Sequence, residues 1–212
     1  MNNLAEKLRQ YTKEDYADKK IDLHIHTECS DGEGNWGQIL KSAKDKGYEL
    51  ISITDHNTLE VHKQTKDDIL ITGAEFDCWF GYVFIHLLCY GVDINNEKLQ
   101  NFLARGKWSK CGTEHAIIRI LTFRNVKKLI EAIHDAGGIA ILAHPACCWA
   151  LCLERLVKNL MKLGLDGIEV YYPYDRFRSI VKFHSAKSVK KIADKYPELI
   201  QTGGSDFHGK EF

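Results

Sequence analysis

The chain has 212 residues, of which 44% are hydrophobic and 27% are charged, with three prolines and 16 glycines. This length favours one domain, and the composition excludes collagenous and low-complexity classes. The 29 basic residues balance the 29 acidic ones. A net charge of zero argues against a protein that coats nucleic acid or binds an anionic membrane, whereas a few local charges suffice to hold a small phosphorylated substrate.

No stretch of 18 apolar residues is present, and the first 20 residues are polar and lack the apolar core of a signal peptide. We therefore expect a cytoplasmic protein whose seven cysteines are reduced thiols. Their number is odd, and the paired spacing of a zinc finger is missing. Cys147, Cys148 and Cys152 could form a thiolate site, but the start of a helix is the preferred interpretation.

Leu4, Leu8 and Tyr11 have helical spacing, which predicts a docking helix over residues 2–18. Residues 21–25 alternate apolar and polar, which predicts a strand, and a helix to about residue 46 follows a glycine-rich loop. Further strands are expected at 50–54, 69–72, 82–90, 139–143, 167–171 and 199–202, and further helices at 95–105, 125–136, 151–163 and 185–195.

About seven strands alternating with helices predict parallel strands covered by helices. Most histidine, aspartate and glutamate clusters fall at or just after the carboxyl end of a strand. In a β/α barrel these ends gather at one face, whereas an open doubly wound sheet joins only those near its switch point. We therefore predict an α/β fold, a distorted seven-stranded β/α barrel with its site at the C-terminal face of the strands.

Histidine dominates the candidate site, since the chain has ten. His24 and His26 lie about 6.5–7 Å apart on one strand face, which suits two ligands of one metal or of adjacent metals. Asp31, in a glycine-rich turn, can reach back over the strand end as an oxygen ligand. Asp22, one pleat deeper, is expected to orient a ligand histidine.

Two carboxylates and a histidine follow the next strands. His56 is a ligand candidate, and Asp55 before it can orient an imidazole, donate a proton or cap the next helix. Glu75 is placed at the end of the third strand, where a carboxylate can bridge two cations. Asp77 has the same strand parity as Glu75 and receives no role.

The later candidates are His86 in an apolar strand, His144 before Pro145, and the pair Asp206 and His208 after two glycines that permit close backbone approach. Each alone fits a core histidine or a loop ion pair. The full set of candidate ligands is His24, His26, Asp31, His56, Glu75, His86, His144, Asp206 and His208. Nitrogen and oxygen ligands without sulfur indicate more than one metal and favour Mn²⁺, Zn²⁺ or Fe²⁺ over Mg²⁺ or Ca²⁺.

Basic residues near this face are candidates for binding a substrate phosphate. We select Arg124, Arg119 and Arg178, because arginine binds phosphate in a bidentate manner. The alternative for each of them is a solvated surface charge.

The ordered motifs resemble the PHP (polymerase and histidinol phosphatase) superfamily of metal-dependent phosphoesterases. They are Asp22-Leu-His-Ile-His-Thr27, Ser30-Asp-Gly32, Thr54-Asp-His-Asn57, Gly73-Ala-Glu75, Ile85-His-Leu-Leu88, Ala143-His-Pro145, Gly167-Ile-Glu-Val170 and Gly204-Ser-Asp-Phe-His-Gly209. The resemblance covers residues 21–209 and implies a distorted seven-stranded barrel with a trinuclear metal site.

The resemblance also implies how the ligands are shared. The first metal would be held by His24, His26, Glu75 and Asp206, the second by Asp31, His56 and His208, and the third by Glu75, His86 and His144. Two to three divalent ions are expected, with Mn²⁺ preferred and Zn²⁺ or Fe²⁺ as alternatives. Asp55, His56 and Asp31 are the expected catalytic residues.

Asp31 and the final motif resemble the subgroup of nucleoside 3′,5′-bisphosphate phosphatases and 5′-to-3′ exonucleases of short RNA. We therefore expect a phosphoesterase that hydrolyses a small nucleotide or a short single-stranded oligonucleotide by a metal-activated hydroxide. Histidinol-phosphate-type phosphatase and a non-catalytic metal-binding module are the alternatives. No membrane partner is expected, and the oligomeric state stays open.

Two features depart from that subgroup. The segment between His86 and His144 leaves a short helical lobe at about 94–124, where relatives carry a larger one. The chain also stops four residues after His208, so the last helix is absent or the form is truncated. We divide the chain into an N-terminal helical extension at 1–20 and a phosphoesterase domain at 21–212.

Overall fold

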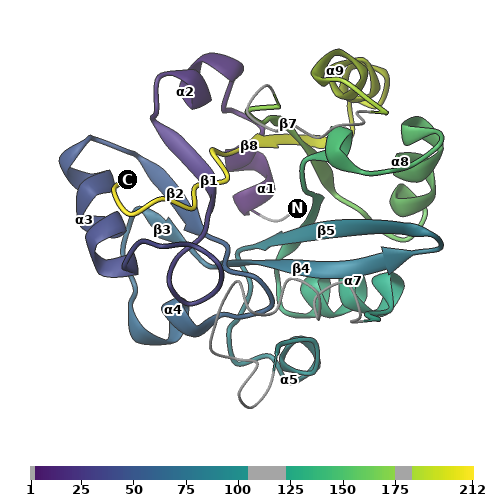
Figure 1. The fold of residues 1–212 in the computed structure, drawn as a ribbon. Coiled ribbons are helices and arrows are strands. Elements are labelled where there is room, and N and C mark those ends of the chain that lie inside the picture. Colours follow the sequence, from purple (N-terminus) through teal and green to yellow (C-terminus); the bar gives the residue numbers. More distant parts are fainter. Residues whose placement is uncertain (1–2, 105–122, 175–182) are drawn as a thin grey trace.

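The computed structural model describes residues 3–104, 123–174 and 183–212. In these residues two sheets are surrounded by helices (Figure 1). The parallel three-stranded sheet has the order β1 (Ile21–Ile25), β2 (Leu50–Ile53) and β3 (Leu70–Ile71). The five-stranded sheet has the order β4 (Gly73–Phe80), β5 (Val83–Tyr90), β6 (Ile139–Leu142), β7 (Gly167–Tyr171) and β8 (Ile200–Gly203). The expected α/β class is confirmed.

The predicted closed seven-stranded barrel is not confirmed. In the five-stranded sheet β5 runs antiparallel to both β4 and β6, while β6, β7 and β8 are parallel. The two sheets meet through isolated bridges, which pair Ile25 with Phe207 and His56 with Glu75. The sheets stay separate because β3 has only two residues and β4 turns straight back into β5. The first bridge is flanked by candidate ligands on both segments of the pair, and the second joins two candidate ligands directly.

Strand β4 corrects the expected position of Glu75. A strand was expected to end at Glu75, but Glu75 lies inside β4, opposite Leu88 of β5. Gly81, with a φ of 62°, makes the tight turn between the two strands. The hairpin register places Asp77 opposite His86. The hairpin therefore brings two carboxylates and a histidine to one face of the sheet.

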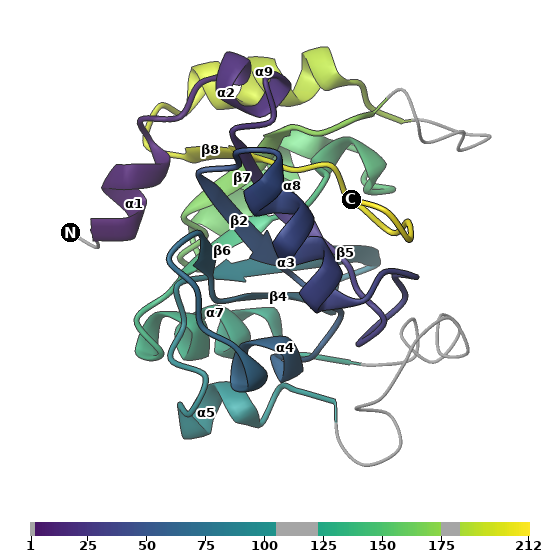
Figure 2. The same ribbon diagram turned by 90° about the vertical axis from the view of Figure 1, so that its left-hand side faces the viewer.

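The helices cover the outside of the sheets, as two perpendicular views show (Figures 1 and 2). They are α3 (Trp36–Asp45), α4 (Glu60–Gln64), α5 (Glu97–Gln100), α7 (Val126–Asp135), α8 (Leu153–Met161) and α9 (Ala186–Lys195). Helix α4 was not expected, and α5 is shorter than predicted. Residues 105–122, most of the expected lobe, lie outside the described residues. No described helix has the length and apolarity needed to cross a membrane.

The N-terminal segment forms two helices, α1 (Asn3–Leu8) and α2 (Lys13–Ala17), instead of one. The break occurs because Thr12 begins α2 with a capping box, in which its backbone N–H donates to Asp15 over 2.8 Å. Leu8 is fully buried in a cluster with Ile21 and Leu23 of β1. The segment therefore packs on the core through α1, which agrees with the expected docking.

A carboxylate–imidazole pair between α7 and the residue before β7 gives a pH-dependent contribution to stability. The Nε2 atom of His134 lies 2.8 Å from Asp166, and this hydrogen bond raises the pKa of His134. The stabilisation is complete below the unfolded-state pKa of about 6.5 and is lost as pH rises through the folded-state pKa. Because the pair is half-exposed, we expect His134→Gln to reduce this pH dependence by less than about 1 kcal/mol in urea unfolding. The same pH dependence in the variant would contradict this assignment.

Candidate metal centre

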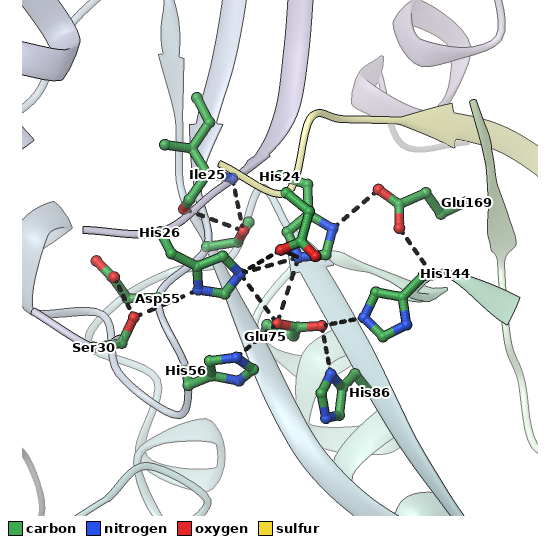
Figure 3. A network of polar contacts seen from close by, with 12 residues as sticks. His24, Ile25, His26, Ser30, Asp55, His56, Glu75, His86, His144 and Glu169 are labelled. Carbon is green, nitrogen blue, oxygen red and sulfur yellow. Dashed lines mark hydrogen bonds and ion pairs between the residues drawn. The ribbon is translucent and has the colours of Figure 1, made fainter. Parts of the chain in front are cut away.

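The nine predicted ligands converge on one region between the two sheets. Figure 3 shows the imidazoles of His24, His26, His56, His86 and His144 around the carboxylate of Glu75. Most of them follow strand ends as expected: His26 after β1, His56 after β2, His144 after β6, and the pair Asp206 and His208 after β8. Asp31 lies in the loop after β1, whereas His24, Glu75 and His86 lie inside β1, β4 and β5 respectively. Long-range strand pairing thus assembles a cluster from segments up to about 180 residues apart in sequence.

Glu75 lies at the centre of the cluster and is 1% exposed. Its Oε1 atom lies 2.9 Å from His86 Nδ1 and 3.0 Å from His144 Nε2. Its Oε2 atom lies 3.4 Å from His24 Nε2, 3.2 Å from His26 Nε2 and 3.2 Å from His56 Nε2. One buried carboxylate thus faces five imidazoles, as a ligand shared between cations would.

Two aspartates occupy the open side of the cluster. Asp31 lies 3.2 Å from His208 Nε2, 3.4 Å from His26 Nδ1 and 3.5 Å from His56 Nε2. Asp206 lies 3.3 Å from His26 Nε2, and its other oxygen accepts a hydrogen bond from the hydroxyl of Tyr172 over 2.7 Å. Sequence reasoning missed Tyr172, which follows β7 and fixes the orientation of this carboxylate.

The ligand atoms form groups compact enough to hold metal ions. Within each group they lie within 4.8 Å of one another, and the groups are His26, Asp31, His56 and His208; His24, Glu75 and His144; His24, His26 and Asp206; and His56, Asp77 and His86. The donor set is imidazole and carboxylate, which suits first-row divalent metals. The residues therefore fit a multinuclear centre, although Asp77 stands beside His86 where the resemblance implied no such partner.

The electrostatics of the cluster favour cations. Burial raises the pKa of Glu75, but the charges of His86, His56 and His24 outweigh it and hold that pKa well below the usual range. Burial lowers the pKa of His26, whereas hydrogen bonds to Asp206 and Glu75 raise it to about 10. The carboxylates thus keep their negative charge, and protons on the imidazoles compete with metal ions for the same nitrogens.

Glycines let the loops approach the ligand strand. A Cβ atom on Gly204 would lie 2.3 Å from the Cβ of His24, and one on Gly32 would lie 2.5 Å from the backbone of His26. Both distances are shorter than side-chain contacts allow, so only glycine fits. This close approach confirms the expectation for Gly204 and brings the loops of Asp31 and Asp206 over the end of β1.

Glu169 is a buried carboxylate to which the sequence assigned no role. Its Oε1 atom lies 3.0 Å from His24 Nδ1, and its Oε2 atom accepts a 2.8 Å hydrogen bond from the backbone N–H of His144. It therefore orients one ligand side chain and fixes the backbone of another. A lone acid in the apolar strand β7 was the signal available in the sequence.

Asp22 and Asp55 accept hydrogen bonds from backbone N–H groups and from loop side chains near the cluster. Asp22 was expected to orient an imidazole, but its Oδ1 atom accepts hydrogen bonds from the backbone N–H groups of His24 and Ser205. Asp55 accepts hydrogen bonds from Thr27 and from Ser30 and so holds the loop that carries Asp31. Its role as a proton donor stays a prediction.

One of the three predicted phosphate-binding arginines lies in the described part of the chain. Arg124 donates hydrogen bonds to the backbone carbonyls of Phe102 over 2.8 Å and Asp77 over 3.1 Å. Arg119 and Arg178 lie outside the described residues. Phosphate binding by these three residues stays a prediction.

A cavity of about 330 Å³ opens onto the cluster. The candidate ligands Asp31, His56, Glu75 and His208 line it, and Phe84 is part of its wall. A larger cavity of about 720 Å³ lies between the N-terminal helices and α9, but no histidine is among its lining residues. The chemistry therefore belongs to the smaller cavity.

Residues 22–204 match the PHP domain family. An uncharacterised protein of Methanocaldococcus jannaschii is 29% identical over 194 residues, covering 83% of this chain and 95% of that protein. Phosphoribosyl 1,2-cyclic phosphate 1,2-diphosphodiesterase of Eggerthella lenta is 23% identical over 259 residues, covering 89% and 94% respectively.

A solved structure from Bifidobacterium adolescentis, of a protein proposed to be a metal-dependent phosphoesterase, superposes with a TM-score of 0.70. It is 20% identical, over 90% of this chain and 88% of that one, so it supports the fold. This chain belongs to the PHP domain family. It is thereby a metal-dependent hydrolase of phosphate esters, as the resemblance in the sequence implied.

Proposed function

We propose that the chain hydrolyses the phosphate ester of a small nucleotide or of the end of a short oligonucleotide, with two to three divalent metal ions held by the cluster. Mn²⁺ is the preferred metal, and Zn²⁺ and Fe²⁺ are alternatives. The observation that carries the proposal is the central place of Glu75 in the cluster, where its two oxygens face five imidazoles beneath one cavity.

Bound metal ions would supply the positive charge that polarises the phosphoryl group and lowers the pKa of an attacking water. The chain's own residues would hold the metal ions and orient the substrate. Asp31 and His56 line the cavity, where we assign them as catalytic residues that would hold a metal ion beside the substrate phosphate. The cavity lies at the small end of the range for ligand sites, which supports a compact phosphorylated group.

The Eggerthella lenta relative is named for hydrolysis of a ribosyl cyclic phosphate. A ribose that carries phosphate is also the core of a nucleotide, so that name supports a phosphoribosyl substrate for this chain. It also makes a cyclic phosphodiester the second candidate. The positive charge that such a metal cluster would supply assists hydrolysis of monoesters and diesters alike.

The proposal is tested by phosphate release from purified protein with Mn²⁺. The panel contains adenosine 3′,5′-bisphosphate, a 5′-phosphorylated trinucleotide, a ribose 1,2-cyclic phosphate with a coupled phosphatase, and histidinol phosphate. We expect turnover of a nucleotide, reduced at least about 100-fold in His56→Ala because a ligand is lost. His134→Gln removes a histidine outside the cluster and should keep the activity.

Other outcomes would replace the proposal with a stated alternative. Turnover of histidinol phosphate alone would indicate a histidinol-phosphate-type phosphatase. Silence across the panel with metal bound would favour a non-catalytic metal-binding module, and silence without metal would refute the assignment of the cluster.

A further inference from the structure

Asp77 is a fully buried carboxylate of β4 that the sequence left without a role. Its Oδ1 atom lies 3.3 Å from the Nδ1 atom of His56 and 3.2 Å from the Nε2 atom of His86. One oxygen therefore contacts two of the predicted ligands from the side away from the centre of the cluster.

The other nitrogen of each imidazole faces Glu75. His56 Nε2 lies 3.2 Å from one Glu75 oxygen, and His86 Nδ1 lies 2.9 Å from the other. A neutral imidazole has one N–H and one lone pair. If Asp77 accepts the N–H of each ring, the lone pairs of His56 Nε2 and His86 Nδ1 both point to the centre.

Asp77 is itself held in place by Asn57. The side-chain amide of Asn57 donates to Oδ2 of Asp77, and the backbone N–H of Asp77 donates to Oδ1 of Asn57 over 3.1 Å. Asn57 has a φ of 56° and donates its own backbone N–H to the Glu75 carbonyl over 2.7 Å. This two-way pairing fixes the side chain of Asp77, so Oδ1 stays aimed at the two rings.

We propose that Asp77 is a positioning residue that couples two metal positions of this centre. The inference rests on the proposed metal-dependent function and adds a positioning residue to the proposed metal centre. His56 belongs to a group with Asp31 and His208 and to another with Asp77 and His86, and His86 also faces the oxygen of Glu75 that His144 faces. Because one oxygen of Asp77 orients both His56 and His86, its loss weakens metal binding at both of their positions.

Asp77→Asn tests this coupling with little change in volume. The new amide must point its NH₂ group either at the NH₂ group of Asn57 or at the imidazole N–H groups, so it cannot keep both sets of hydrogen bonds. Asp166→Asn is the matched control, because Asp166 also contacts an imidazole, His134 Nε2 at 2.8 Å, but outside the cluster.

The first readout is the number and affinity of bound Zn²⁺ ions, measured by equilibrium dialysis and atomic emission. We expect Asp77→Asn to lower the affinity for at least two of the bound Zn²⁺ ions by about 10–100-fold. Asp166→Asn should bind Zn²⁺ as the wild type does. Wild-type affinities in Asp77→Asn would overturn the inference. Absence of bound metal from the wild type would instead refute the proposed function on which it rests.

The second readout needs no variant and so is independent of its folding. Long-range ¹H–¹⁵N spectra of the Zn²⁺-loaded wild type report which nitrogen of each imidazole carries the proton. We expect the proton on Nδ1 of His56 and on Nε2 of His86, which are opposite tautomers. The same tautomer in both rings, or Zn²⁺ bound to the nitrogens that face Asp77, would overturn the positioning role.

Discussion

Glu75→Gln is expected to reduce the rate of phosphate-ester hydrolysis to the uncatalysed background and to release bound metal. The substitution keeps the size of the side chain but removes a buried negative charge that faces five imidazoles. Each of those imidazoles would lose its shared anionic partner, and one amide cannot accept hydrogen bonds at both ends. The measurements are phosphate release with Mn²⁺ and metal content per chain.

Glu154→Gln provides the control for this substitution. Glu154 lies on α8, outside the cluster, where it pairs with Lys195 at 2.6 Å. An exposed pair of this kind contributes little to stability, so its loss should leave activity and metal content as in the wild type. Full metal content with normal activity in Glu75→Gln would show that Glu75 is not the shared ligand.

Removal of metal by a chelator is expected to lower the melting temperature and to abolish activity, and added Mn²⁺ should restore both. A ligand that binds only the folded state at about 1,000 times its Kd stabilises it by about 4 kcal/mol. In a domain of this size that corresponds to a shift of about 8–16 °C. Thermal unfolding before and after chelation measures the shift.

The metal effect should also depend on pH. Because Asp206 and Glu75 raise the pKa of His26 to about 10, protons compete with metal for its nitrogens, and metal affinity falls as pH is lowered. A chelator that empties the protein without changing its melting temperature would contradict the location of the metals in the core.

The convergence of the candidate ligands could be predicted from the sequence because they lie at regular positions in short patterns. His24 and His26 share a strand face through period-two alternation, and His144 directly follows an apolar strand. The prediction that a strand ends at Glu75 was wrong, because the hairpin turn at Gly81 was not recognised. The alternation of Glu75 and Asp77 with buried apolar residues was the available signal of a longer strand.

The roles of Glu169 and Asp77 could not be predicted from local patterns. Glu169 contacts His24 across 145 positions, and the interaction exists only once β1 and β7 are placed. Asp77 meets His86 only through the β4–β5 register. The break between α1 and α2 had a local signal, the capping box that begins at Thr12, which the apolar spacing of the segment concealed.

Crystals of the protein grown with Mn²⁺, measured by anomalous diffraction at the manganese edge, test the central assignment most directly. We expect two or three anomalous peaks beside the Glu75 carboxylate, among nitrogens of His24, His26, His56, His86 and His144. Crystals that hold manganese with no peak beside Glu75 would contradict it.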